Sequence, residues 1–129
     1  MNKYHAIVVI LLLCINPESR GDSCPSPDKI RQRDLPKQYE WTVDDKTSLK
    51  DLLSAQKLYS VRIMDNGLYV SCHYTTAKWP IKLDVAPAQG ECTFSHQKGE
   101  WKSTPSGQDV CMEKNAGNCG FIYTCKQAR

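Results

Sequence analysis

The sequence lacks the residue spacings that mark most metal, redox and nucleotide sites. No C-x-x-C pair occurs among its seven cysteines, which argues against a zinc ribbon and against a thioredoxin-like redox centre. The three histidines, His5, His73 and His96, form no H-x-H or H-x-x-x-H spacing. There is also no G-x-S-x-G nucleophile motif and no glycine-rich phosphate loop. We therefore predict no metal ligand, no cofactor and no catalytic residue.

A block of charge of one sign is also missing. The chain holds 17 Lys and Arg against 14 Asp and Glu, with a net charge of +3. Its densest basic stretch, residues 29–33, is flanked by Asp28 and Asp34. Nucleic-acid-binding domains usually gather positive charge on one face, so we do not expect nucleic acid as a partner.

Long hydrophobic runs are absent too. The longest run covers residues 6–15, whereas a membrane-spanning helix needs about 20 apolar residues. Lys3 precedes this run, and the small residues Ser19 and Gly21 follow it. A basic start, a short apolar core and small residues at the exit are the pattern of a secretory signal peptide. The sequence thus predicts cleavage after Gly21 and no membrane span.

A lipoprotein signal is the alternative interpretation of this start, with Cys14 as the lipidated residue. Leu13 stands where such a signal requires a small residue, so we favour ordinary cleavage. The predicted organisation is a signal peptide at residues 1–21 and a single disulfide-bonded domain at residues 22–129. The expected location is secreted or periplasmic.

Six cysteines lie beyond the predicted signal: Cys24, Cys72, Cys92, Cys111, Cys119 and Cys125. An even number in a small exported chain predicts that all of them form disulfides. Such bonds would matter because a chain of this size buries a limited core. The sequence leaves the pairing open. We expect a bond between Cys72 and Cys92, because each stands on the apolar face of a predicted strand and neighbouring strands can bring Cα atoms to about 5.5 Å.

Residues 58–74 predict a β-hairpin, because "DNG" separates two β-rich runs. A two-residue turn at Asn66 and Gly67 would pair Val61 with Cys72 and Tyr59 with Tyr74. The other face of the hairpin would then carry Ser60, Arg62, Met64, Tyr69, Ser71 and His73. Adjacent strand residues point to opposite faces, so Cys72 and His73 cannot act as a nucleophile and its base. We expect Cys72 in the core and His73 on the surface.

The remaining pattern is mainly β. Strands are predicted at residues 38–43, at residues 81–85, near residues 92–94 and at residues 121–125. Residues 48–56 predict one short helix with Ser48 and Asp51 as a capping box, although a period-two pattern runs through part of the same stretch. Residues 24–37 are rich in proline and are expected to be extended, and residues 102–109 are expected to be a loop. The fold class is an antiparallel, disulfide-stabilised β domain.

Three stretches together resemble a known family: "CPSPDKI" from Cys24, "YEW" from Tyr39 and "GLYVSCHY" from Gly67. The chain is similar to an uncharacterised family of small exported proteins of Gram-negative bacteria, a domain of unknown function. The family commonly closes on C-P-F, for which residues 119–121 offer Cys-Gly-Phe. The resemblance implies export and a small disulfide-bonded fold, and it brings no reaction or catalytic residue.

These observations favour a non-enzymatic exported binding protein whose partner is an unidentified protein or glycan. A small secreted hydrolase with an unrecognised site is one alternative. A secreted protein inhibitor is another, with residues 112–118 as its contact loop. The three tryptophans, Trp41, Trp79 and Trp101, could form a platform for a sugar or peptide, although core and rim positions are commoner for such residues.

Overall fold

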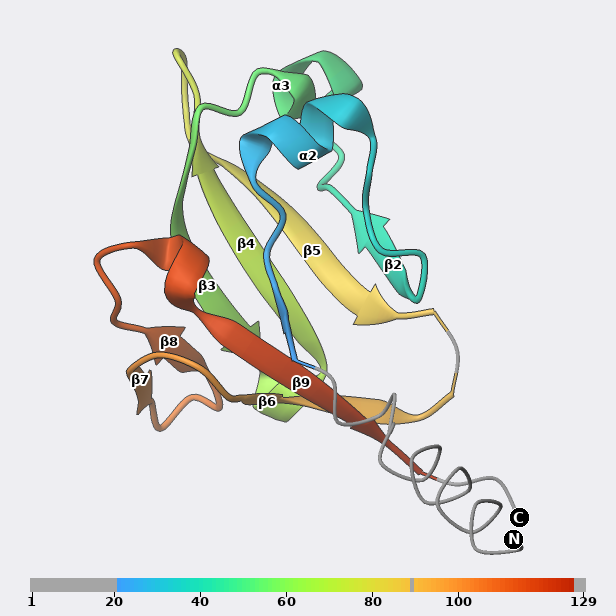
Figure 1. The fold of residues 1–129 in the computed structure, drawn as a ribbon, viewed down its shortest axis with the longest axis vertical. Helices are drawn as coiled ribbons and strands as arrows, with labels where there is room; N and C mark the ends of the chain where they lie inside the picture. The colour runs from blue at the N-terminus through green and yellow to red at the C-terminus, as the bar shows by residue number, and fades with distance from the viewer. Residues whose placement is uncertain (1–20, 89, 127–129) are drawn as a thin grey trace, which may run out of the picture.

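The structure is a computed structural model that describes residues 21–88 and 90–126. It is mainly β, as predicted, and folds as two antiparallel sheets (Figure 1). The larger sheet has six strands in the order β2 (Tyr39–Thr42), β5 (Ile81–Pro87), β4 (Tyr69–Thr75), β3 (Lys57–Met64), β8 (Asp109–Cys111) and β7 (Trp101–Ser103). The smaller sheet has three strands in the order β1 (Asp22–Ser23), β9 (Gly120–Cys125) and β6 (Cys92–His96).

The hairpin of β3 and β4 has the predicted register over most of its length. Val61 pairs with Cys72, Ile63 with Val70 and Ser60 with His73. Asn66 and Gly67 have φ values of 57° and 96°, as the predicted turn requires, within a 3-10 turn at Asp65–Gly67. A Cβ on Gly67 would also lie 2.7 Å from the carbonyl oxygen of Phe94, so this turn packs directly on β6.

The predicted register fails at the open end of the hairpin. A bulge at Tyr59 makes Leu58, not Tyr59, the partner of Tyr74. An extra residue on one strand shifts every residue beyond it to the other face. Tyr59 therefore leaves the core and is 42% exposed, whereas Leu58 and Tyr74 are buried.

Two short helices occupy the segments between the first strands. Helix α3 (Leu49–Leu53) begins with the predicted capping box, in which Ser48 and Asp51 exchange hydrogen bonds of 3.1 Å. Helix α2 (Pro27–Gln32) contradicts the expected extended segment. Ser26 caps it and Pro27 occupies its first turn. The N–H that proline lacks would have no partner within the helix at that position, so proline is tolerated there. The prolines that suggested an extended chain thus begin a helix.

The core lies between the larger sheet and the layer made by the smaller sheet and α2. Alternate residues of β3, β4 and β5 supply one side of it, and Val61, Cys72 and Leu83 are at most 1% exposed. Tyr39, Phe94, Phe121 and Tyr123 form an aromatic cluster in which neighbouring ring centroids are 5.5–6.4 Å apart. The Tyr74 hydroxyl donates to the carbonyl of Pro25 at 2.6 Å and so ties the sheet to the segment before α2.

All six cysteines of the described residues form disulfides, as predicted, but the expected Cys72–Cys92 pair is wrong. The bonds are Cys24–Cys72, Cys92–Cys125 and Cys111–Cys119. Cys92 belongs to the smaller sheet, where it stands directly opposite Cys125. Cys72 belongs to the larger sheet and meets Cys24, which comes directly after β1. The prediction assumed that β4 and β6 are neighbours in one sheet, and they are not.

A second hairpin, β7–β8, was not predicted, because its strands have three residues each and its connection reads as loop. Within it the Thr104 N–H donates to the Gln108 carbonyl at 2.8 Å. The other predicted strands are present as β2, β5, β6 and β9. The predicted signal peptide lies outside the described residues except for Gly21. No helix of the described segments is long and apolar enough to cross a membrane.

Candidate binding site on the outer face of the six-stranded sheet

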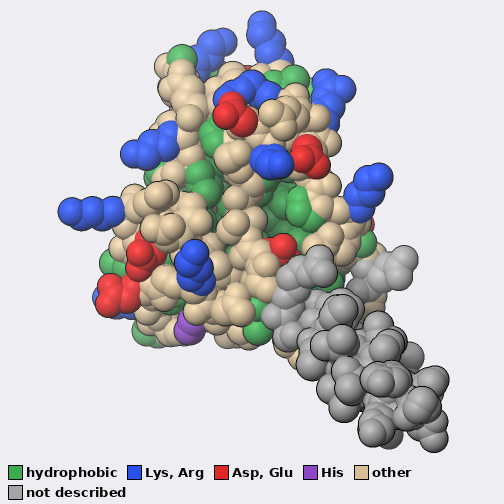
Figure 2. All heavy atoms as spheres, in the orientation of Figure 1, with side chains coloured by type: hydrophobic (Ala, Val, Ile, Leu, Met, Phe, Trp, Pro, Cys, Tyr) green, Lys and Arg blue, Asp and Glu red, His purple; other side chains and the backbone are tan. Residues whose placement is uncertain are grey.

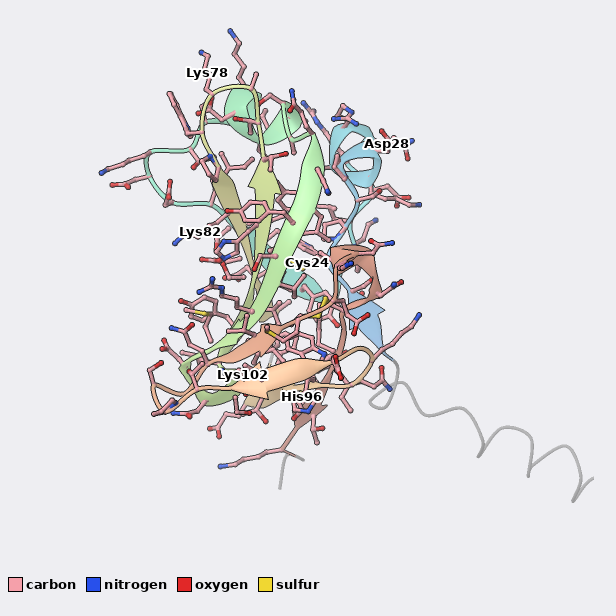
Figure 3. All side chains as sticks on the ribbon, turned by 90° about the vertical axis from the view of Figure 1, so that its left-hand side faces the viewer. Cys24, Asp28, Lys78, Lys82, His96 and Lys102 are labelled. Carbon is pink, nitrogen blue, oxygen red and sulfur yellow. A yellow bond between two sulfur atoms is a disulfide. The ribbon has the colours of Figure 1, made fainter. Side chains whose placement is uncertain are left out.

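One face of the larger sheet is not covered by any other layer of the described residues (Figure 3). Residues paired across an antiparallel ladder share a face, and those next to core residues point away from the core. We call this side the outer face; its central members are Ser60, Arg62, Met64, Tyr69, Ser71, His73, Lys82, Asp84 and Ala86. Figure 3 shows Lys82 on one side of the sheet and Cys24 on the other. The polar face predicted for the hairpin is therefore extended by β5.

Two rows of polar residues cross the middle of the outer face. The ladders align Arg62 with Ser71 and Asp84 in one row, and Ser60 with His73 and Lys82 in the next. Ser71 is only 3% exposed although it stands on the solvent side of the sheet, because larger side chains surround it. A hydroxyl, an imidazole, a guanidinium and a carboxylate thus meet within two rows.

Ser71 and His73 contact each other directly. The Ser71 hydroxyl oxygen lies 3.1 Å from Nε2 of His73, and the Tyr59 ring stands edge-on to the imidazole with centroids 6.0 Å apart. Burial lowers the pKa of His73, the positive charges of Arg62 and Lys82 lower it further, and Asp84 opposes them. The imidazole is therefore neutral near pH 7, and in the tautomer that carries its proton on Nδ1 its Nε2 accepts a hydrogen bond from the Ser71 hydroxyl. His73 points to the face of the sheet away from Cys72, as predicted, but its side chain is half-buried and not fully exposed.

Two buried polar atoms on this face have no hydrogen-bond partner among the described residues. They are Nε of Arg62 and Oδ1 of Asp84, which stand on either side of Ser71. Leaving such a group unsatisfied costs about 1–3 kcal/mol, and more for a charged group. Native proteins rarely keep such atoms without a bound water, ion or ligand to complete them. A ligand that supplies a hydrogen-bond acceptor to Arg62 and a donor to Asp84 would therefore satisfy both atoms.

A pocket of about 740 Å³ continues from Asp84 and Tyr69 toward the edge of the smaller sheet. We call it the Asp84 pocket; it is lined by Thr42, Leu68, Tyr69, Asp84, Ala86, Pro87, Gly90, Glu91, Cys92, Thr93, Thr124 and Lys126. Its apolar wall contains Leu68, which is 60% exposed, and the Cys92–Cys125 disulfide. A volume in this range is typical of small-molecule sites.

A larger groove of about 980 Å³ lies on the opposite side of the molecule, beside β1 and α2. Figure 2 shows that side, where Lys and Arg side chains project around the edge. Among its charged groups, Lys29 pairs with Asp34 at 3.0 Å, and Asp22 accepts a hydrogen bond from Tyr39. The buried side-chain polar atoms that lack a partner among the described residues lie on the outer face and not in this groove, so the groove is a weaker candidate than the outer face.

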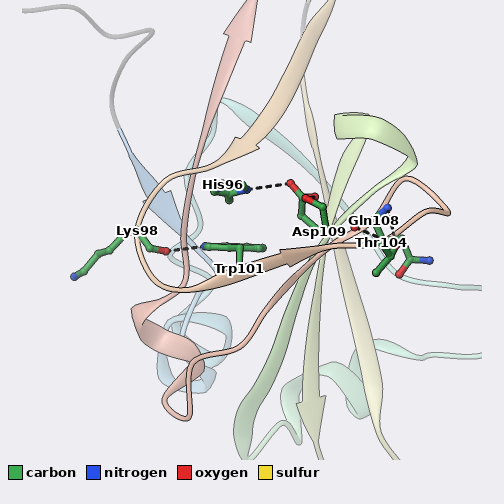
Figure 4. A network of polar contacts seen from close by, with 7 residues as sticks. His96, Lys98, Trp101, Thr104, Gln108 and Asp109 are labelled. Atoms are coloured by element: carbon green, nitrogen blue, oxygen red, sulfur yellow. Dashed lines mark hydrogen bonds and ion pairs between the residues drawn. The ribbon is translucent and has the colours of Figure 1, made fainter.

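His96 belongs to a separate network at the base of the molecule (Figure 4). Its Nδ1 lies 3.1 Å from Asp109, which also accepts a hydrogen bond of 2.7 Å from Ser103. The hydrogen bond from Ser103 lowers the pKa of Asp109, and His96 lowers it further. Trp101 stacks on the imidazole with centroids 5.7 Å apart and donates to the Lys98 carbonyl at 2.8 Å. This network attaches the β7–β8 hairpin to β6.

The other sequence candidates are dispersed. Trp41 and Trp101 lie on opposite edge strands of the larger sheet, and Trp79 lies in the connection from β4 to β5 with Lys78 over its ring at 5.8 Å. They form no common platform. Residues 112–118, expected as an inhibitor loop, are enclosed by the Cys111–Cys119 disulfide, with Met112 57% exposed. No group of three or more His, Cys, Asp or Glu in the described segments could hold a metal ion.

Sequence reasoning placed Ser71 and His73 on one face but missed the role of Asp84. The alternation of residues 81–85 already directs Asp84 outward. The sequence pattern does not show that β5 pairs with β4, which places Asp84 beside Ser71. Strand pairing of this kind is not determined by the residues within either strand.

Comparison of the chain with protein-family models, with curated proteins and with solved structures finds no match in any of the three. The resemblance to exported Gram-negative proteins remains a prediction from the quoted motifs. The outer face and its pocket therefore carry the functional argument on their geometry alone.

Proposed function

We propose that this protein is an exported, non-enzymatic binding protein that holds its partner on the outer face of the six-stranded sheet. One observation carries the proposal: on either side of Ser71, a buried donor on Arg62 and a buried acceptor on Asp84 have no hydrogen-bond partner in the part of the chain that the structure describes. A partner that supplies one acceptor and one donor would complete both. Glycan hydroxyls and exposed peptide groups have this chemistry, and either class fits the proposal.

The proposed binding predicts that Arg62 and Asp84 are needed for partner recognition and not for folding. The double variant Arg62→Met, Asp84→Leu removes both unpartnered atoms. A matched control, Asp45→Leu with Lys50→Met, makes the same change in charge at two exposed positions. Immobilised proteins are tested against defined glycans and purified extracellular proteins by biolayer interferometry. We expect at least tenfold weaker binding for the outer-face variant and unchanged binding for the control. Equal binding by both variants would contradict the proposal.

Export is part of the same proposal. All six described cysteines are oxidised, and structural disulfides are typical of oxidising compartments. The apolar run at residues 6–15 supports a cleaved signal. N-terminal sequencing of protein recovered outside the cytoplasm should begin near Asp22. Retention of residues 1–15, or an acyl group on Cys14, would contradict it.

A second candidate function is supported by the 3.1 Å contact between Ser71 and His73. In a hydrolase, the Ser71 oxygen would attack an ester carbonyl while His73 Nε2 takes the hydroxyl proton. The C–O bond to the alcohol would then break, the alcohol would leave with the proton returned by His73, and water would hydrolyse the acyl-serine to release the acid and restore the Ser71 hydroxyl. Against this, Ser71 is almost fully buried and Asp84 makes no hydrogen bond to His73. A fluorophosphonate probe decides between the two: labelling that disappears in Ser71→Ala would favour the hydrolase, and absence of labelling favours binding.

A further inference from the structure

We propose that the Asp84 pocket binds a small organic ammonium ion with an apolar body. The proposal goes beyond the function proposed above, since it assigns a small ligand to the pocket beside the face that holds the glycan or protein partner. The ammonium group would lie against the Asp84 carboxylate and the Tyr69 ring. The apolar body would occupy the cavity toward Leu68, Pro87 and the Cys92–Cys125 disulfide.

The charges that line the pocket favour a cation. Its lining holds two carboxylates, Asp84 and Glu91, and one ammonium, Lys126. Lys126 lies 3.4 Å from Glu91 in an exposed ion pair, so these two charges largely cancel. Asp84 is then the uncompensated charge of the lining, and its Oδ1 is buried without a hydrogen bond among the described residues. A charged donor from a ligand would satisfy that oxygen, whereas an anionic ligand would be repelled.

Tyr69 strengthens this preference. It stands on the same face as Asp84, because it lies two residues before Ser71 on β4 and the ladder pairs Ser71 with Asp84. Burial raises the pKa of Tyr69, and the charges of Asp84 and Asp65 raise it further. The phenol therefore stays protonated and uncharged near neutral pH. A carboxylate beside an aromatic ring is a common arrangement for binding ammonium groups, because the ring face attracts cations.

The apolar wall of the pocket favours a ligand with an apolar body. Leu68 is 60% exposed at the hairpin turn, and Ala86 and Pro87 continue the wall along the end of β5. Hydroxyls of Thr42, Thr93 and Thr124 are the other uncharged polar groups of the side-chain lining. A simple hydrated cation would leave this wall in contact with water. An aryl or alkyl amine covers it, which favours an amphipathic ligand over an inorganic ion.

Arg62 lies outside this arrangement. It stands across Ser71 from Asp84 and is absent from the pocket lining. Its cation therefore does not occupy the site proposed for the ligand. This separation makes Arg62 a useful control, since Arg62→Met should impair partner binding on the outer face without removing the ammonium site.

The test is an NMR titration of the ¹⁵N-labelled protein with 2-phenylethylammonium and, in parallel, with neutral 2-phenylethanol. We expect saturable shifts of the Tyr69, Asp84, Ala86 and Thr93 amides with the ammonium probe, and at least tenfold weaker binding of the alcohol. Asp84→Asn, which keeps the shape of the side chain, should abolish this difference. Asp45→Asn, at an exposed turn, should leave it unchanged.

Other results of the same titration would contradict the proposal. Equal binding of the two probes, or shifts located away from the pocket, would overturn the ammonium assignment. Saturable binding of a lysine-containing hexapeptide without binding of 2-phenylethylammonium would give the pocket to a protein side chain and overturn the small-molecule proposal. If the ammonium probe fails while Arg62→Met, Asp84→Leu still loses the partner, this inference alone fails. If neither effect is seen, the proposed function fails with it.

Discussion

At the scale of single residues, the outer face differs from an ordinary solvent-exposed sheet surface in the burial of its polar groups. Ser71 is almost fully covered, and Arg62 and Asp84 each have a buried atom that forms no hydrogen bond within residues 21–88 and 90–126. Neither side chain forms an ion pair among the described residues. Sites that bind ligands often keep such costly arrangements, because selection for function tolerates a loss of stability.

Removing either unpartnered buried atom should stabilise the fold. Arg62→Met and Asp84→Leu each eliminate one unsatisfied buried group, and we expect each to raise the free energy of unfolding by about 1 kcal/mol. Urea denaturation monitored by tryptophan fluorescence measures the change. Lys82→Leu is the matched control, because it lies on the same strand and face as Asp84 but is exposed. A loss of stability in both test variants, with no change in the control, would show that the two groups are already satisfied.

The half-buried His73 should make stability depend on pH. Its pKa is lowered in the folded protein, chiefly by burial, from an ordinary value near 6.5. The unfolded chain therefore binds a proton more readily than the folded one. The contribution of neutral His73 to the free energy of unfolding is therefore complete above about pH 6.5. It is lost as the pH falls from there through the lowered pKa of the folded protein.

Thermal unfolding from pH 8 to pH 4 measures this dependence. The wild-type protein should lose stability below about pH 6.5 more steeply than His73→Gln, which cannot titrate. His96→Gln serves as the control for the other described histidine, whose partner is Asp109. Parallel curves for the wild-type protein and His73→Gln would mean that His73 is not desolvated in the folded state.

At the scale of elements, the predictable parts are those determined by neighbouring residues. The Asn66–Gly67 turn set the hairpin register, and Ser48 with Asp51 set the start of α3. The Tyr59 bulge was not predictable, because no residue in β3 requires it. Helix α2 had a local signal, since Ser26 and Pro27 form a standard helix start, and the proline content obscured it.

The disulfides should differ in how much they stabilise the fold, because they close loops of unequal length. Cys24–Cys72 joins residues 48 positions apart, whereas Cys111–Cys119 joins residues only 8 apart. A longer loop loses more entropy in the unfolded chain when it is closed, by about 1.6 kcal/mol for this pair of loops. The double variant Cys24→Ala, Cys72→Ala should therefore be less stable than Cys111→Ala, Cys119→Ala, and Cys72 also leaves a cavity in the core.

Guanidinium denaturation of the two double variants tests this order. A double substitution keeps every remaining cysteine paired, so mispairing does not confuse the comparison. Equal stability of the two variants would indicate that the unfolded chain is already compact around Cys24 and Cys72, and that loop length contributes little.

At the scale of the whole molecule, the two sheets are one unit because the segment after β1 crosses between them. β1 pairs with β9 in the smaller sheet, and Cys24, directly after it, bonds to Cys72 in the larger one. The sequence predicted that six cysteines would pair but not which ones, since the division of strands into two sheets depends on contacts between distant segments. The Asp84 pocket was missed for the same reason: its wall combines β2, β4, β5, β6 and β9.

The arrangement predicts that none of the six described cysteines is reactive in the native protein. Alkylation without reductant, followed by peptide mass analysis, should find them unmodified and linked as Cys24–Cys72, Cys92–Cys125 and Cys111–Cys119. Alkylation after unfolding in reductant is the positive control. A peptide containing Cys72 linked to Cys92 would contradict the division into two sheets.

The order of these cysteines along the chain has a consequence for biosynthesis. The Cys111–Cys119 bond is nested within Cys92–Cys125, so Cys92 must wait for a partner at the far end of the chain. If an oxidase joined cysteines in the order in which they emerge from a translocation channel, Cys24 would meet Cys72 correctly, but Cys92 would be joined to Cys111. Maturation would then depend on a disulfide isomerase. Cells lacking that enzyme should accumulate the Cys92–Cys111 species while Cys24–Cys72 still forms. Native pairing at full yield without it would mean that folding of β9 precedes oxidation.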